Sequence, residues 1–353
     1  MTNQFSLKYR PQKFSEVYGH KKTIDGLLQY SKNNNFPKVI LLSGITGSGK
    51  TTIANILIKA MLCDNRIEGE PCNQCYYCKA INENKPIENL SIYNGSNLGI
   101  DEARLIEDKT NKHLLGKKNI KIFVIDEFQE VPNQRAQKNI LKVLEKTNDN
   151  CYFILGTMEK SKIDSAIVNR SVNYNLVLDY KEIRDYLIYI VQQEKIVVDE
   201  NSKLPEMVTT IVDNCDGSLR TAISMLERVV NSSIETEEDL FKELGIVSDT
   251  VVNEMIKGIL QANIKKIDFK VNEDVLNIIN KKLLIMYKHV CGLDINAFEK
   301  GQVRNIGRIG KDVLENTIKG FAELNNYSYL KSDFIQFQMI NILMQNKIII
   351  KKN

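Results

Sequence analysis

The segment from Val39 to Thr52, with the sequence VILLSGITGSGKTT, decides the fold of this chain. Its first four residues are all apolar, which is typical of a parallel strand that is covered on both faces. The pattern G-x-x-x-x-G-K-T then runs from Gly44 to Thr51, and a helix is expected from Thr51 to Ala60. A strand, a phosphate-binding loop and a helix N-terminus are therefore predicted in direct succession.

This loop has the residue types that bind a nucleotide. Glycines let backbone N–H groups close around phosphate oxygens, and the positive end of the helix favours an anion. Lys50 reaches the outer phosphates, and the Thr51 hydroxyl ligates Mg²⁺. A chance glycine-rich turn is the alternative, which the preceding strand and the following helix disfavour. The predicted binding residues of the loop are Gly44, Thr46, Gly47, Ser48, Gly49, Lys50, Thr51 and Thr52.

Two further apolar runs predict the rest of the nucleotide site. Ile122 to Ile125 ends at Asp126-Glu127, where Asp126 would hold Mg²⁺ and Glu127 would orient or activate the attacking water. A solvated pair of carboxylates is the alternative. Cys151 to Leu155 ends near Thr157, at a position where a hydroxyl contacts the outer phosphate or the water. Catalytic roles are therefore predicted for Lys50, Asp126, Glu127 and Thr157.

Four cysteines follow the phosphate loop at metal-ligand spacing. Cys63, Cys72, Cys75 and Cys78 form the pattern C-x8-C-x2-C-x2-C. Four thiolates satisfy one tetrahedral Zn²⁺ and leave no position for water, so the metal is predicted to be structural. A redox dithiol is disfavoured because four cysteines cluster, whereas the spacing leaves an iron–sulfur cluster open.

Composition describes an ordinary folded protein. The chain has 353 residues, of which 43% are hydrophobic and 26% charged, and its net charge is +4. This length is enough for two or three domains. Its start lacks the apolar core of a signal peptide, and no apolar run has the length of a membrane span. The seven cysteines agree with a reducing compartment, so we expect a cytoplasmic protein without membrane contact.

The order of the elements predicts three domains. Apolar strands alternate with helices, such as the one expected at 134–145, which indicates an open parallel sheet in residues 1–176, with the zinc module at about 62–80. Helices are expected at 179–194 and 218–230, within a small helical domain at 177–237. Helical spacing from Leu276 to Val290 and from Ile335 to Leu343 predicts an all-helical domain at 238–353.

A set of short motifs adds a family resemblance over most of the first 230 residues. The motifs are KYRP at Lys8–Pro11, Phe14, VYG at Val17–Gly19, SNLGID at Ser96–Asp101, LKVLE at Leu141–Glu145, NRS at Asn169–Ser171 and GSLR at Gly217–Arg220. Together with the phosphate loop, the cysteines and Asp126-Glu127, this set resembles the gamma/tau subunit of the bacterial DNA polymerase III clamp loader, an AAA+ ATPase.

The resemblance implies an AAA+ fold with an inserted zinc module, followed by a helical lid and an all-helical oligomerisation collar. It implies that Arg170 reaches the ATP site of a neighbouring subunit. Arg220, from the lid, would contact the phosphates of its own site as the second sensor, with Thr157 as the first sensor. ATP, Mg²⁺ and Zn²⁺ are the implied cofactors. The implied adenine pocket consists of Tyr9, Arg10, Pro11 and Val17.

Several positions depart from the family pattern. Gln129 replaces the histidine of the acidic motif DEVH, and Met158 replaces the second threonine at the first sensor. Asn169 and Ser171 flank Arg170 where the family has serine and cysteine. Since the lysine, both acids and both arginines are present, hydrolysis is expected to be retained and its tuning altered. A short form without the tau-type tail is expected, and a bacterial and a phage origin both stay open.

The resemblance implies the motor subunit of a clamp loader. ATP hydrolysis would open and load the sliding clamp onto primed DNA, with polymerase activity only through the holoenzyme. Expected partners are other clamp-loader subunits in a pentameric ring, the clamp, and primer–template DNA that is bound without sequence readout. Residues 95–104 could hold the DNA backbone, or form an ordinary loop and helix cap. Alternatives are a non-hydrolysing, delta-prime-like subunit and another DNA-processing AAA+ ATPase.

Overall fold

The computed structural model divides the chain into two compact units, Met1–Asn231 and Ser232–Asn353. It describes residues 4–112, 114, 118–132, 134–146, 148–196, 204–232, 237–244, 249–261, 273–293, 311–325, 341–342 and 345–346. The division by contacts falls at 231/232, and it groups the predicted nucleotide-binding and lid domains in the first unit. The three-domain boundaries at 176 and 237 stay predictions.

A five-stranded parallel sheet forms the centre of the first unit, in the order β2-β3-β4-β1-β5. Parallel strands end at the same edge, so Ser43, Asp126 and Thr157 lie together at their carboxyl ends. The strands are β1 (Val39–Ser43), β2 (Leu90–Asn94), β3 (Lys121–Asp126), β4 (Cys151–Thr157) and β5 (Val172–Asn175).

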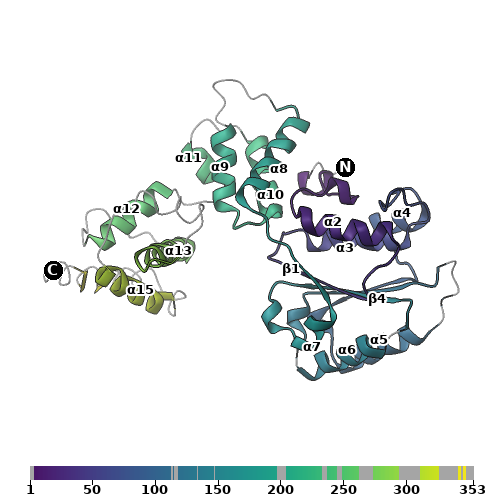
Figure 1. Cartoon of the computed structure of the whole chain (residues 1–353). Helices are drawn as coiled ribbons and strands as arrows, with labels where there is room; N and C mark the ends of the chain where they lie inside the picture. The colour runs from purple at the N-terminus through teal and green to yellow at the C-terminus, as the bar shows by residue number, and fades with distance from the viewer. Residues whose placement is uncertain are drawn as a thin grey trace. The chain divides into compact units, whose positions relative to one another are not determined.

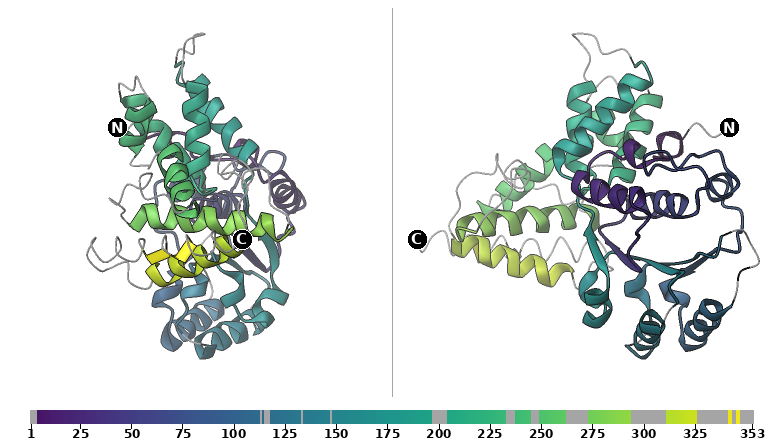
Figure 2. Two further views of the ribbon diagram at one scale, coloured as in Figure 1. Left: turned by 90° about the vertical axis from the view of Figure 1, so that its left-hand side faces the viewer. Right: turned by 45° about the vertical axis from the view of Figure 1, so that its right-hand side comes forward.

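Helices cover both faces of this sheet, as Figures 1 and 2 show. On one face lie α2 (Lys21–Lys32), α3 (Lys50–Leu62) and α4 (Tyr76–Asn82). On the other face lie α5 (Ile100–Asn111), α6 (Gln134–Lys146) and α7 (Ser165–Arg170). Alternate residues of β1 enter the two cores, because successive side chains of a strand point to opposite faces. This explains the continuously apolar run at 39–42.

The lid consists of helices with polar caps. Asp179 accepts a hydrogen bond from the backbone N–H of Glu182 and thereby caps α8 (Tyr180–Gln193). Ser218 accepts one from Thr221 at the start of α10 (Leu219–Asn231). Both helices were expected from the sequence. The lid also contains α9 (Leu204–Asn214), and the short N-terminal helix α1 (Phe5–Lys8) packs on α10.

The described part of the second unit is helical. It contains α11 (Glu237–Leu244), α12 (Asp249–Leu260), α13 (Glu273–Val290) and α15 (Lys311–Asn325). The last three share a core that includes Ile256, Leu283 and Phe321. Ile335 and Leu343 of the predicted pattern lie outside the described residues. An α/β domain followed by an all-helical region is thus confirmed. None of the described helices has the length and apolar character needed to cross a membrane.

Candidate nucleotide-binding site and metal centre

The phosphate loop connects β1 directly to α3, as the sequence predicts. The Lys50 ammonium lies across the loop and donates to the carbonyl oxygens of Gly44, at 2.8 Å, and Ile45, at 3.1 Å. Burial lowers the pKa of Lys50, while the nearby carboxylates of Glu127 and Asp126 act in the opposite direction. The lysine is thus held inside the loop, close to the acids that were expected to complete the site.

The loop leaves a polar space at the start of α3. Gly47 has a φ of +80°, and a Cβ there would lie 2.2 Å from the Ser218 hydroxyl at the start of α10 in the lid, so only glycine fits. The Ser48 hydroxyl is buried and has no hydrogen-bond partner within the described chain. A buried polar atom without a partner is costly. Gly47, Gly49, Lys50 and Thr51 line the cavity at this helix N-terminus, so the loop fits the predicted phosphate ligand.

The two acids stand at the end of β3 beside the loop. Asp126 accepts a hydrogen bond from the backbone N–H of Glu127, and Glu127 has a left-handed φ of 50°. Gly156 of the adjacent β4 leaves room for the aspartate, since a Cβ there would lie 2.7 Å from Asp126 Oδ1. Carboxylate and hydroxyl oxygens are suitable Mg²⁺ ligands, and Thr51 lies in the same cavity as both acids.

Three cations, Arg10, Lys50 and Arg220, face this space. Burial lowers the pKa of Arg10, and the nearby charge of Arg220 lowers it further. Burial also lowers the pKa of Lys50, and Arg220 has a smaller effect in the same direction. A guanidinium that lowers the pKa of two neighbouring cations adds positive potential to this space. A triphosphate would relieve this repulsion, which agrees with the expectation that Arg220 faces phosphate.

One cavity of about 400 Å³ joins these groups. It includes most of the predicted nucleotide residues, whereas Gly44, Ser48, Val17, Thr157 and Arg170 are not among its lining residues. Those lining residues are Ser6, Leu7, Tyr9, Arg10, Pro11, Thr46, Gly47, Gly49, Lys50, Thr51, Thr52, Asp126, Glu127, Tyr186, Leu219, Arg220 and Ile223.

The N-terminal side of the cavity is held by the lid. The Tyr186 hydroxyl of α8 donates to the backbone carbonyl of Tyr9, and the Tyr9 hydroxyl donates to Glu194. Burial and then this carboxylate raise the pKa of Tyr9. Val17 packs against the core below α2 and α3 instead. Tyr186 and Ile223 were missed from the sequence, because nothing local marks a lid residue that faces the nucleotide.

His20 also contacts the phosphate loop and was missed. Its Nε2 lies 3.0 Å from the carbonyl oxygen of Ser48, and burial lowers its pKa. It follows the VYG motif directly, which is the signal that could have identified it.

Two predicted functional residues lie outside the cavity. Thr157 is fully buried at the end of β4, and its carbonyl accepts from the backbone N–H of Gly44. Arg170 ends α7, where its guanidinium pairs with the half-exposed Glu145 at 2.5 Å. Arg170 therefore does not act on the nucleotide cavity of its own chain in this conformation.

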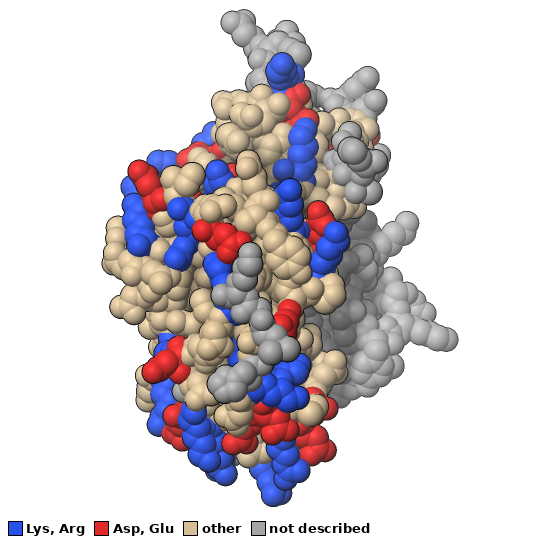
Figure 3. All heavy atoms as spheres, turned by 90° about the vertical axis from the view of Figure 1, so that its right-hand side faces the viewer, with Lys and Arg blue, Asp and Glu red and all other residues tan. Residues whose placement is uncertain are grey.

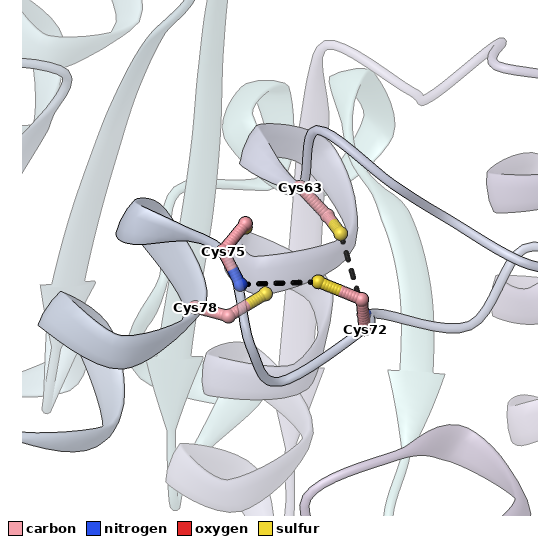
Figure 4. A group of neighbouring side chains, drawn as sticks. All are labelled: Cys63, Cys72, Cys75 and Cys78. Carbon is pink, nitrogen blue, oxygen red and sulfur yellow. Dashed lines mark hydrogen bonds between the residues drawn. The ribbon is translucent and has the colours of Figure 1, made fainter.

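The four predicted metal ligands come together. Their Sγ atoms all lie within 4.8 Å of one another, and Figure 4 shows the side chains converging. Cys63 follows the last residue of α3, and Cys75 and Cys78 belong to the start of α4. A tetrahedral Zn²⁺ with Zn–S bonds of about 2.3 Å needs sulfurs about 3.8 Å apart, so the cluster fits one Zn²⁺ ion.

The surroundings shift the pKa values of the cysteine thiols in different directions. Burial raises the pKa of Cys63 and Cys78. Burial acts the same way on Cys72, but N–H groups of Gln74 and Cys75 hold the pKa of Cys72 lower, at about 6. A cation would favour all four thiolates, which agrees with a metal site.

The cysteine module also holds the N-terminal segment. The Glu70 carboxylate accepts from the backbone N–H groups of Phe14 and Ser15, both at 2.8 Å. Buried Lys59 donates to the side-chain oxygens of Gln12, at 2.7 Å, and Asn73, at 2.8 Å. Gln12, Phe14 and Ser15 directly follow the segment Tyr9 to Pro11, which lines one side of the nucleotide cavity. The module therefore holds that segment in place.

The segment expected to hold DNA is a capped helix start. Gly99 N–H donates to the Glu102 carboxylate, and Ser96 N–H donates to Asn94. Asp101 and Glu102 also place negative charge in the first turn of α5. These contacts favour the alternative of an ordinary cap. Basic and acidic side chains are interspersed over the face shown in Figure 3.

Comparison with known proteins agrees with this arrangement. Residues 19–178 match the family model described as "DNA polymerase III, delta subunit". The chain is 32% identical over 263 residues to the tau subunit of DNA polymerase III from Bacillus subtilis, covering 72% of this chain and 45% of the relative. It is 29% identical over 337 residues to the gamma/tau subunit from Mycoplasma genitalium, covering 93% and 53%.

A solved RuvB mutant from Thermotoga maritima is 17% identical, with a TM-score of 0.47, covering 90% of this chain and 98% of that one. The chain spans about half the length of the first two curated relatives.

The parallel sheet, the phosphate loop and the helical lid define a P-loop protein of the AAA+ ATPase class, a class that binds nucleotide with Mg²⁺. Within this class, the chain is similar over 72–93% of its length to the tau subunit of Bacillus subtilis and the gamma/tau subunit of Mycoplasma genitalium.

Proposed function

We propose that the chain is the ATP-hydrolysing motor subunit of a DNA polymerase clamp loader. The observation that carries the proposal is the single cavity in which the phosphate loop, Asp126-Glu127 and the lid residue Arg220 meet. The gamma/tau relatives support the clamp-loader context. Other loader subunits, a sliding clamp and primed DNA are the proposed partners.

The residues divide the chemistry among them. Lys50 and Arg220 neutralise the phosphates, and Thr51 and Asp126 would hold Mg²⁺, which supplies further positive charge to the transferred group. Glu127 takes a proton from the attacking water as the bond between the γ-phosphorus and ADP breaks. Arg170, which lies outside its own cavity, acts on the site of a neighbouring subunit, so the active site is complete only in an assembly.

ATP turnover tests this function. The complete chain is assayed alone and with the loader subunits, clamp and primed DNA of its own genome. We expect clamp and DNA together to stimulate turnover, and Glu127→Gln to abolish turnover while ATP binding persists. Absence of turnover in the wild-type complex, or normal turnover in the variant, would contradict the proposal.

A non-hydrolysing structural subunit is the second candidate, favoured by the match to the delta-subunit model. Such a subunit has no need of Lys50, Asp126 and Glu127 in one cavity, which is why the motor is preferred. The same assay separates them, since a structural subunit supports clamp loading without hydrolysing ATP itself.

We further propose that the cysteine cluster binds one structural Zn²⁺. Elemental analysis of the purified protein should find one zinc per chain. Iron in place of zinc would contradict this assignment and support the alternative of an iron–sulfur cluster.

A further inference from the structure

Gln129 is buried between the carboxylate of Glu127 and the end of β4, and it is only 7% exposed. Its amide nitrogen Nε2 donates to Glu127 Oε2 at 2.5 Å. Its amide oxygen Oε1 accepts from the Thr157 hydroxyl at 2.8 Å and from the backbone N–H of Met158 at 3.0 Å. One side chain therefore joins the proposed water-activating acid to the proposed first sensor.

The chemistry of these contacts fixes which way the amide faces. A backbone N–H can only donate, so the group that faces Met158 must be the amide oxygen. The NH₂ group then has to face Glu127, which accepts as a carboxylate. Gln129 thereby holds one carboxylate oxygen of Glu127 in place, and it does so without a charge of its own.

The Thr157 hydroxyl has one proton to donate. That proton goes to Gln129, while the same hydroxyl oxygen accepts from the backbone N–H of Glu159 at 3.1 Å. Removal of this hydroxyl, as in Thr157→Val, leaves the Met158 backbone N–H as the remaining donor to the amide oxygen of Gln129 among these contacts. The position of the amide nitrogen that donates to Glu127 is then less well defined.

We propose that Gln129 is a positioning residue that couples the Thr157 hydroxyl to the Glu127 carboxylate. The placement of Glu127 then depends on the Thr157 hydroxyl and the Met158 backbone N–H, which together hold the amide oxygen of Gln129. This inference rests on the proposed ATPase function and concerns the same site.

Gln129→Leu tests the coupling, because leucine is similar in volume and makes no hydrogen bond. We expect kcat in the complete assembly to fall at least about tenfold while the ATP dissociation constant stays within about twofold. The matched control is Asn89→Leu. Asn89 is 6% exposed and donates to the carbonyls of Lys118 and Ile120 beside the first residues of β2 and β3, at the other end of the sheet, so it measures the cost of losing a buried amide.

Gln129→Glu gives a readout that a purely structural role would not produce. A glutamic acid can donate to Glu127 only when it is protonated, and two ionised carboxylates repel each other. The kcat of this variant, relative to wild type, should therefore recover as the pH falls and decline as it rises. In a double-mutant cycle, Gln129→Leu and Thr157→Val should be less than additive in kcat.

The outcomes separate the two proposals. Wild-type turnover together with an unchanged kcat in Gln129→Leu, or additive effects in the cycle, would overturn the coupling and leave the ATPase standing. A loss of kcat in Gln129→Leu no larger than in Asn89→Leu would also overturn it. No turnover in the wild-type assembly would overturn the ATPase, and this inference with it.

Discussion

The two ends of α3 carry two different binding loops. At its N-terminus, the loop from Gly44 to Gly49 offers backbone N–H groups, with Lys50, to an anion. At its C-terminus, Cys63 is the first of four thiol ligands for a cation. Because a helix favours anions at its start and cations at its end, the dipole of α3 suits both ligands.

The two loops differ in what completes them. All ligands of the cysteine module lie within residues 63–78, so the site needs no distant segment. The nucleotide cavity needs Tyr9, Asp126 and Arg220, from the N-terminal segment, the sheet and the lid. From this difference we expect substitutions in the cysteine module to affect folding, and substitutions in the phosphate loop to affect nucleotide binding.

The largest effect is expected when the module is broken. Cys78→Ser removes a fully buried ligand, and the free energy of unfolding should fall by more than about 3 kcal/mol because metal binding contributes to folding. Thermal unfolding and zinc content measure this. Exposed Cys291, changed to serine, should alter neither. If the Cys78→Ser protein lacked zinc and kept its full stability, the module would have no role in folding.

Breaking the phosphate loop should affect binding alone. Lys50→Ala should weaken ATP binding about 100-fold, or about 2.7 kcal/mol, because a charge-assisted contact to phosphate is lost. Titration calorimetry measures the affinity, and the unfolding curve without nucleotide should be nearly unchanged. Lys22→Ala, at an exposed position of α2, is the control. Collapse of the fold in Lys50→Ala would contradict the comparison.

The connection between the two loops can be cut at Glu70. Glu70→Gln removes the carboxylate that accepts from Phe14 and Ser15, so the segment before them should loosen. We expect ATP affinity to fall about three- to tenfold and stability by about 1–2 kcal/mol. Exposed Glu68→Gln lies in the same loop and should change neither. Unchanged ATP affinity would mean that the module does not support the nucleotide site.

The smallest effect concerns His20. Burial lowers its folded pKa below the usual value, so the unfolded chain binds the proton more readily. Its contribution to stability is present above the unfolded pKa and is lost as the pH falls through the folded pKa. His20→Gln keeps a donor for the Ser48 carbonyl and cannot titrate, so part of the acid destabilisation should disappear. Identical pH profiles of unfolding for both proteins would contradict this.

The sequence predicts the three central strands because each is apolar on both faces. It missed the outer strands β2 and β5, whose side chains are partly exposed and largely polar. Neither segment has a continuous apolar run, and the alternation of apolar and polar residues in β5 spans only four residues, so pairing with β3 and β1 makes them strands.

The candidate site divides in the same way. The phosphate loop, the acids and the cysteines were found because each is a short local pattern whose chemistry depends on spacing. Gln129 was found only as a departure from a family motif. Its contact with Thr157 depends on the pairing of β3 with β4, which brings residues 28 positions apart into hydrogen-bonding distance.

The sequence by itself determined the class of fold, the anion-binding loop and the set of metal ligands, since backbone conformation and ligand spacing are local properties. Only the tertiary structure decided that Arg10, Lys50 and Arg220 share one cavity and that Arg170 lies outside it. It also decided that the cysteine module holds the N-terminal side of the nucleotide site. Charge and hydrogen bonding act over a few ångströms in space, whatever the separation along the chain.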